Sequence, residues 1–104
     1  MSVTMRIIQR FKAPHEREFM TLEREFAALE RSRPDYPKGR RLQPIAAGAP
    51  CNSLIWEAEF PDLESARRTL DFFAGDAAHE RLLERQRPFF EEIRIEFYQN
   101  LELP

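Results

Sequence analysis

The sequence predicts an α+β fold whose elements follow one another in the order β-α-β-β-α-β. Two patterns indicate this order. Apolar and polar residues alternate over 5–11, 54–60 and 92–99, as they do in strands that bury one face. Apolar residues recur every three or four positions over 15–32 and 62–86, as they do in helices that bury one side. We therefore expect an antiparallel sheet with the helices on one face.

The first half of the chain supplies two strands and one helix. In the strand at 5–11, one face contains Met5, Ile7, Gln9 and Phe11. Pro14 occupies a favourable first position for the helix over 15–32, and Pro34 ends that helix. The apolar side of the helix contains Phe19, Leu22, Phe26 and Leu29. Residues 40–47 predict a short second strand, which Pro44 restricts to the edge of the sheet.

The second half supplies two strands and a helical region in two segments. In the strand at 54–60, one face contains Leu54, Trp56, Ala58 and Phe60. Asp62 is a strong N-cap for the next helix, Gly75 ends that helix, and Asp76 caps a second segment that runs to about Gln86. Pro88 breaks the helical region. In the last strand, at 92–99, one face contains Ile93, Ile95 and Phe97.

This order is the ferredoxin-like split pattern, a βαββαβ subunit with an antiparallel four-stranded sheet and helices on one face. The strand at 5–11 then lies between the strands at 54–60 and 92–99. The predicted core lies on the face beneath the helices and contains Ile7, Phe11, Leu54, Trp56, Phe60, Ile93, Ile95 and Phe97.

The composition limits the class of protein. A length of 104 residues fits a single domain over 1–104, and 42% hydrophobic residues with a net charge of −2 argue against disorder. No apolar run approaches the roughly 18 residues of a membrane-spanning helix. The absence of a basic excess argues against a nucleic-acid partner. Cys51 is the only cysteine, so no internal disulfide can form and we expect a reduced, cytoplasmic protein.

The second sheet face predicts a homodimer. It mixes charge with the apolar Ile8 and Ile55, and opposite charges on neighbouring strands fall beside one another. Such a face suits packing on a second copy, where paired Arg and Glu fix the register. The predicted interface residues are Arg6, Arg10, Glu57, Glu59, Arg94, Glu96 and Tyr98. A monomer with a hydrated sheet face is the alternative.

Residues 54–60, the capped helix after them and the segment Gly75-Asp76-Ala77-Ala78-His79 resemble the dimeric α/β-barrel superfamily. Within it, the resemblance is to domains of the antibiotic-biosynthesis-monooxygenase and NIPSNAP types. It implies a homodimeric barrel of two ferredoxin-like subunits, with a ligand cavity between sheet and helices. The superfamily includes monooxygenases, haem-degrading enzymes, dismutases and isomerases, so the fold does not define the activity.

The haem-degrading branch has three residues that can be compared with this chain. His79 matches the iron-binding histidine of that branch. In that branch a tryptophan lies ten residues before this histidine, and here that position is Thr69. The branch also has an asparagine on the first strand, and here the corresponding position is Gln9. Two departures out of three argue against haem degradation.

The candidate site combines the resemblance with the strand pattern. His79 is the candidate catalytic residue, because a histidine pKa lies near neutrality; a helix-surface histidine is the alternative. Gln9 and Trp56 lie on the helix side of the sheet, where an amide orients a ligand and an indole packs on it, or where both simply belong to the core. The predicted substrate-binding residues are Gln9, Trp56, Thr69 and Phe73.

These residues suggest an enzyme similar to monooxygenases that acts on a small apolar or aromatic oxygenated molecule. No flavin motif, phosphate loop or metal-ligand spacing is present, so we expect neither a metal nor a cofactor. The alternative is a non-catalytic dimer that binds a small molecule or serves a structural role. A closed cavity containing Gln9 and His79 would favour the enzyme, and solid packing around Trp56 would exclude it.

Overall fold

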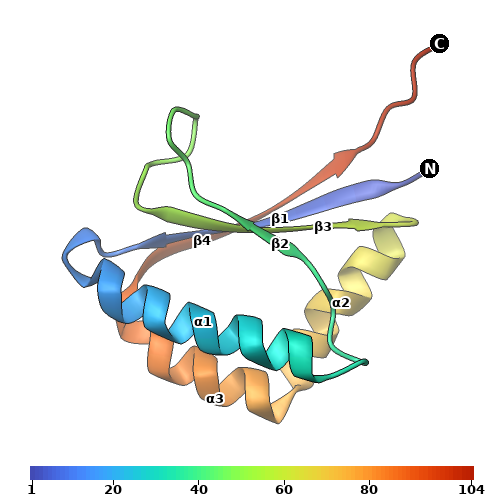
Figure 1. Cartoon of the computed structure of the whole chain (residues 1–104). Coiled ribbons are helices and arrows are strands. Elements are labelled where there is room, and N and C mark those ends of the chain that lie inside the picture. The colour runs from blue at the N-terminus through green and yellow to red at the C-terminus, as the bar shows by residue number, and fades with distance from the viewer.

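The computed structural model describes residues 1–104, and its elements follow the predicted order (Figure 1). The strands are β1 (Val3–Phe11), β2 (Arg40–Leu42), β3 (Ser53–Phe60) and β4 (Phe90–Gln99). The helices are α1 (Glu16–Ser32), α2 (Leu63–Gly75) and α3 (Ala77–Gln86), with short 3₁₀ turns at Ala13–His15 and Arg87–Phe89. All three helices lie on the same side of the sheet (Figure 1).

The strands form one antiparallel sheet in the order β2-β3-β1-β4. The central position predicted for the first strand is therefore confirmed. Ile7 of β1 lies opposite Trp56 of β3 and Ile95 of β4, and Gln9 lies opposite Leu54 and Ile93. This register places the helix-side residues of three strands in rows, and it is the basis of the site described below.

Two aspartates start the helices of the second half. The Asp62 carboxylate accepts the backbone N–H of Ser65 at 2.7 Å, and the Asp76 carboxylate accepts that of His79 at 3.1 Å. Each satisfies an N–H group that has no partner within its helix. The predicted break at Gly75 is also confirmed, because Asp76 has an extended conformation between α2 and α3.

The core consists of two clusters beneath the helices. Met5, Trp56, Ala58 and Ala66 form the first. Phe11, Phe19 and Leu54 form the second, in which the Phe11 and Phe19 rings stack with centroids 4.9 Å apart. The space between sheet and helices is thus filled at Ala66 and at Phe19, and the candidate site lies between these two regions.

Two expectations about the strands are wrong. Ile93, Ile95 and Phe97 do not lie in the core but are 48%, 45% and 39% exposed. They face the helix side, yet β4 is an edge strand and α2 packs against β3 and β1 instead. The strand expected at 40–47 is only Arg40–Leu42, because the chain bends away from the sheet from Ile45 onward.

No helix in the structure has the length and apolar content needed to cross a membrane.

Candidate functional site

A cavity of about 220 Å³ lies between the sheet and the helices. Of the five predicted catalytic and substrate-binding residues, the structure brings four to its lining: Gln9, Trp56, Phe73 and His79. Thr69 does not line it. The Thr69 side chain is buried on α2, and its hydroxyl donates to the Ser65 carbonyl at 3.3 Å. The space around Trp56 is therefore not packed solid.

Most of the lining is apolar and aromatic. The Phe73 ring stacks on the His79 ring with centroids 4.8 Å apart, and the Trp56 ring meets Phe73 edge-on at 5.6 Å. Phe26 of α1 lies 5.2 Å from His79. The apolar lining residues are Ile7, Phe26, Tyr36, Trp56, Leu70, Phe73, Leu83, Phe90, Ile93 and Ile95. Planar aromatic surfaces of this kind suit an apolar or aromatic ligand.

The cavity opens beside β4. Ile93 and Ile95 both line it, and both are about half exposed to solvent. The exposure of these two side chains, which the strand pattern did not predict, therefore marks the mouth of the cavity. Gln9 lies opposite Ile93 in the register, so its amide is placed on the sheet side next to this mouth.

One nitrogen of the His79 imidazole has no hydrogen-bond partner in the protein. Its Nδ1 is buried and makes no hydrogen bond within the chain. Burial lowers the pKa of His79 below its ordinary value, although the carboxylates of Glu80 and Asp76 oppose this effect. The ring is therefore neutral near pH 7, and a neutral imidazole offers one donor and one acceptor nitrogen. The imidazole ring lines the cavity, but Nδ1 itself exposes almost no surface to it, so a ligand contacts this nitrogen only if the ring turns.

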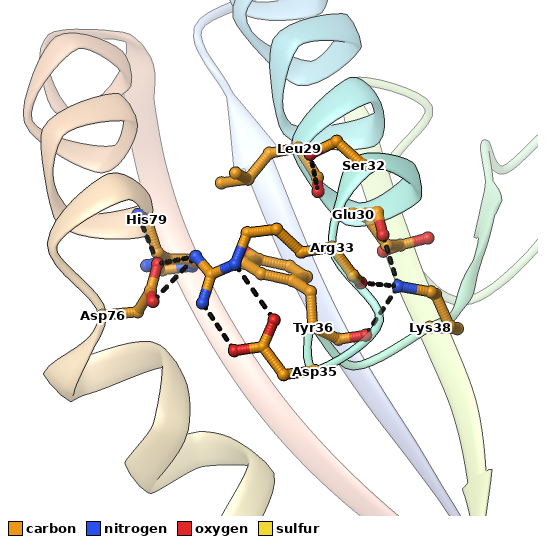
Figure 2. Close-up of polar contacts among 9 residues, drawn as sticks. All are labelled: Leu29, Glu30, Ser32, Arg33, Asp35, Tyr36, Lys38, Asp76 and His79. Carbon is orange, nitrogen blue, oxygen red and sulfur yellow. Dashed lines mark hydrogen bonds and ion pairs between the residues drawn. The ribbon is translucent and has the colours of Figure 1, made fainter.

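Arg33 ties the end of α1 to the start of α3, where His79 lies (Figure 2). Its Nη1 donates to Asp76 Oδ2 at 2.9 Å, while Nε and Nη2 donate to the two Asp35 oxygens. The guanidinium also lies 5.4 Å from the centre of the Tyr36 ring. These contacts fix the position of Tyr36 and His79 on neighbouring walls of the cavity.

Lys38 closes the loop that follows α1. Its ammonium donates to the backbone carbonyls of Glu30, Arg33 and Tyr36, as Figure 2 shows. A cation at these carbonyls satisfies acceptors that the end of a helix leaves free and favours the helix dipole. The loop carries Tyr36 under the helices, where burial raises the pKa of its hydroxyl and keeps it neutral.

A buried ionic network forms the polar end of the cavity. Glu23 and Glu30 of α1 are only 5% and 6% exposed. Arg41 of β2 lies between them, with Nε 2.8 Å from Glu23 Oε1 and Nη1 3.6 Å from Glu30 Oε1. Gln86 donates to the second Glu23 oxygen at 3.1 Å, and the Trp56 indole N–H donates to Glu30 Oε1 at 3.0 Å. Each buried charge therefore has the partner that burial requires.

Sequence reasoning missed this network, although part of the signal was present. Glu23 and Glu30 fall in the same helical series as Phe19 and Phe26, where a carboxylate must be paired if it is buried. Their cation, Arg41, comes from an edge strand whose packing the local pattern does not predict. Tyr36 and Gln86 were also missed as site residues. Both reach the cavity from the end of a helix, and the local pattern does not predict how those ends pack.

The predicted interface residues lie on the face away from the helices. Arg6 Nε lies 2.7 Å from Glu57 Oε1, and Arg94 Nη2 lies 3.4 Å from Glu96 Oε2. The two glutamates fall on either side of Arg6 in the register, as expected. A polar hollow on this face is lined in part by Arg6, Glu57, Glu59 and Tyr98.

Solved structures share this fold over nearly the whole chain. A NIPSNAP family protein from Agrobacterium tumefaciens matches with a TM-score of 0.79 and 14% identity, over 98% of this chain and 95% of that one. A putative antibiotic biosynthesis monooxygenase from Nitrosomonas europaea matches at 0.66 and 11% identity, over 96% and 90%. SnoaB, a cofactor-independent oxygenase from Streptomyces nogalater, matches at 0.61 and 16% identity, over 98% and 95%.

The resemblance seen in the sequence is therefore confirmed at the level of fold. The chain has an α+β, ferredoxin-like fold of the kind found in a NIPSNAP family protein and in a putative antibiotic biosynthesis monooxygenase. No protein-family model matches the chain. No curated protein matches it either.

Proposed function

We propose that the chain is a small-molecule enzyme of the cofactor-free monooxygenase type, acting on an apolar or aromatic oxygenated molecule. The observation that supports this most is the neutral imidazole of His79, whose Nδ1 has no protein partner, in the lining of an aromatic cavity. A polar atom in such a place costs stability unless a ligand uses it. SnoaB, which shares the fold, is described as a cofactor-independent oxygenase, and this supports the same class of chemistry.

In this proposal, His79 is the general base. Its neutral imidazole accepts a proton from an acidic O–H or C–H group of the substrate, which leaves the substrate electron-rich. The substrate itself then reduces dioxygen: a CH₂ group becomes C=O, and the second oxygen atom leaves as water with the two hydrogens. Trp56 and Phe73 pack on the ring of the substrate, and the Gln9 amide orients a polar group near the mouth.

The same cavity would also serve a protein that binds a small molecule without turning it over. Its strongest support is that the charged groups of the lining, Glu23, Glu30 and Arg41, are already paired with other groups of the protein, so that none of these charges is free to take part in a reaction. The two functions differ in whether binding is followed by oxygen consumption.

Oxygen uptake with a panel of hydroxylated aromatic molecules that carry a ring CH₂ group separates these functions. The wild-type chain should consume oxygen with at least one of them, and His79→Gln should lower the rate by about 100-fold or more, the usual contribution of a general base. His15→Gln is the matched control, because His15 is the other histidine and is exposed outside the cavity. Full activity in His79→Gln would remove the role of the base, and binding without uptake would favour the non-catalytic protein.

We also propose that two copies associate through the sheet face that lacks helices. Two features support this: opposite charges in register across β3, β1 and β4, and exposed Tyr98 beside Arg6. Ile8, which the sequence placed on this face, is only 8% exposed in the single chain and adds little to such a contact. The Arg6 guanidinium lies 5.1 Å from the centre of the Tyr98 ring, so the pair presents a flat surface to a second sheet. The cavity lies on the other side of the sheet and would stay open in such a dimer.

A further inference from the structure

We infer that the cavity selects against anionic ligands, so that its ligand is an uncharged or protonated molecule. This inference rests on the proposed function, because it assumes that the cavity binds a small molecule. It assigns the selection to Glu23 and Glu30, two buried carboxylates that line the cavity and that have no part in the proposed proton transfer.

The charge balance of the lining supports this inference. Glu23 and Glu30 contribute two negative charges, Arg41 contributes the only positive charge, and His79 is neutral near pH 7. A ligand that enters this space leaves most of its water behind, so an added carboxylate would meet a net negative lining with little screening. A neutral ligand pays no such cost.

Arg41 does not reverse this preference. An isolated buried guanidinium would attract a carboxylate, but this one lies within 2.8 Å of a Glu23 oxygen and 3.6 Å of a Glu30 oxygen. Its charge is therefore already shared between two anions. A ligand carboxylate could bind it only by displacing one glutamate, which would leave that glutamate buried without its partner.

The other nearby cations are also engaged. Arg33 forms ion pairs with Asp35 and Asp76. Lys38 donates to three backbone carbonyls at the end of α1 and does not line the cavity. The polar groups left for a ligand are therefore uncharged: the Gln9 amide and the Tyr36 hydroxyl, each of which can donate and accept, and the imidazole of His79.

A pair of isosteric probes tests the inference by isothermal titration calorimetry at pH 7. 2-Naphthamide and 2-naphthoate have nearly the same shape, but only the second is an anion. The wild-type chain should bind the amide at least tenfold more tightly than the acid. Glu23→Gln keeps the hydrogen-bonding shape of the side chain and makes the lining neutral, so the ratio should fall severalfold. Glu30→Gln should have the same effect.

Each outcome has a distinct meaning. Equal or tighter binding of naphthoate by the wild-type chain would overturn the inference while the cavity remained a binding site, so that the proposed function would survive. An unchanged ratio in both variants, with wild-type melting temperatures, would show that the carboxylates do not cause the selection. If the wild-type chain bound neither probe, the inference would fall together with the proposed function. Glu25→Gln is the matched control, because Glu25 lies on the same helix and also pairs with an arginine, Arg85, but does not line the cavity.

Discussion

Trp56 is held on three sides, and its position sets the shape of the cavity. Its indole N–H donates to Glu30, and its ring meets Phe73 edge-on. On the third side lies the backbone of Gly39, so close that a Cβ atom there would lie 2.3 Å from Cε2 of the indole. Gly39 is therefore needed for its small size, and any larger residue must push the indole ring out of place.

Substitution of Gly39 tests this arrangement. Gly39→Ala should lower the free energy of unfolding by about 1–3 kcal/mol, the usual cost of overpacking, and should change the fluorescence of Trp56, the only tryptophan. Gly48→Ala is the control, because nothing lies within 4 Å of a Cβ atom at that position. Urea unfolding and emission spectra of both variants give the answer. Equal behaviour of the two would mean that the indole has room to move.

The buried imidazole of His79 predicts a pH dependence of stability. Because burial lowers its pKa in the folded chain, the unfolded chain takes up this proton first, near an ordinary value of about 6.5. The free energy of unfolding should therefore fall as the pH drops below that value, until the folded pKa is passed. His79→Phe should lack this part of the decrease. The measurement is urea unfolding at pH 7.5 and pH 5 for both proteins; an identical pH dependence would contradict the assignment.

At the scale of the elements, the junction between α2 and α3 places His79 in the cavity wall. Asp62 and Asp76 cap their helices in the same way, but only Asp76 also binds Arg33 from α1. Asp76→Ala should therefore lower the free energy of unfolding by about 1–2 kcal/mol and by more than Asp62→Ala does. It should also broaden the NMR signals of the His79 ring. A smaller loss than in Asp62→Ala would mean that the Arg33 contact contributes nothing.

The sequence predicted the elements whose signals are local. Alternation identified β1 and β3, and the caps at Asp62 and Asp76 identified the start of both later helices. It failed where burial depends on which elements cover which strands. Ile93 and Ile95 have the same alternation as a buried strand, but the helices leave these two side chains about half exposed. The same holds for the candidate site. The strand pattern and the resemblance predicted that Gln9, Trp56 and His79 belong to it. The ion pair between Glu23 and Arg41 could be identified only from the folded structure, because it depends on how two distant elements pack.

In the molecule as a whole, the face of the sheet beneath the helices and the face without helices differ in chemistry. The helix side contains the cavity, and the opposite side contains the charged rows through which we propose that two copies pair. Arg94 lies between Glu92 and Glu96 on β4 and forms ion pairs with both. A negative charge at this position would disturb a paired face much more than it would disturb a hydrated one.

Native mass spectrometry tests the pairing. The wild-type chain should be a dimer, and Arg94→Glu should weaken the dimer at least tenfold, as measured by its dilution series. Arg67→Glu makes the same change of charge on the exposed side of α2 and should leave the dimer intact. A wild-type monomer at micromolar concentration would contradict the proposed interface without affecting the cavity.

We propose above that the cavity between the sheet and the helices is a ligand site in which His79 takes part. The most direct test is an NMR titration with neutral hydroxyarenes such as 2-naphthol, in which the ring signals of the two histidines and the indole N–H of Trp56 are followed. The signals of His79 and Trp56 should show saturable shifts, with His15 unchanged. Absence of any shift up to the solubility limit of the probes, or shifts centred on His15, would contradict this proposal.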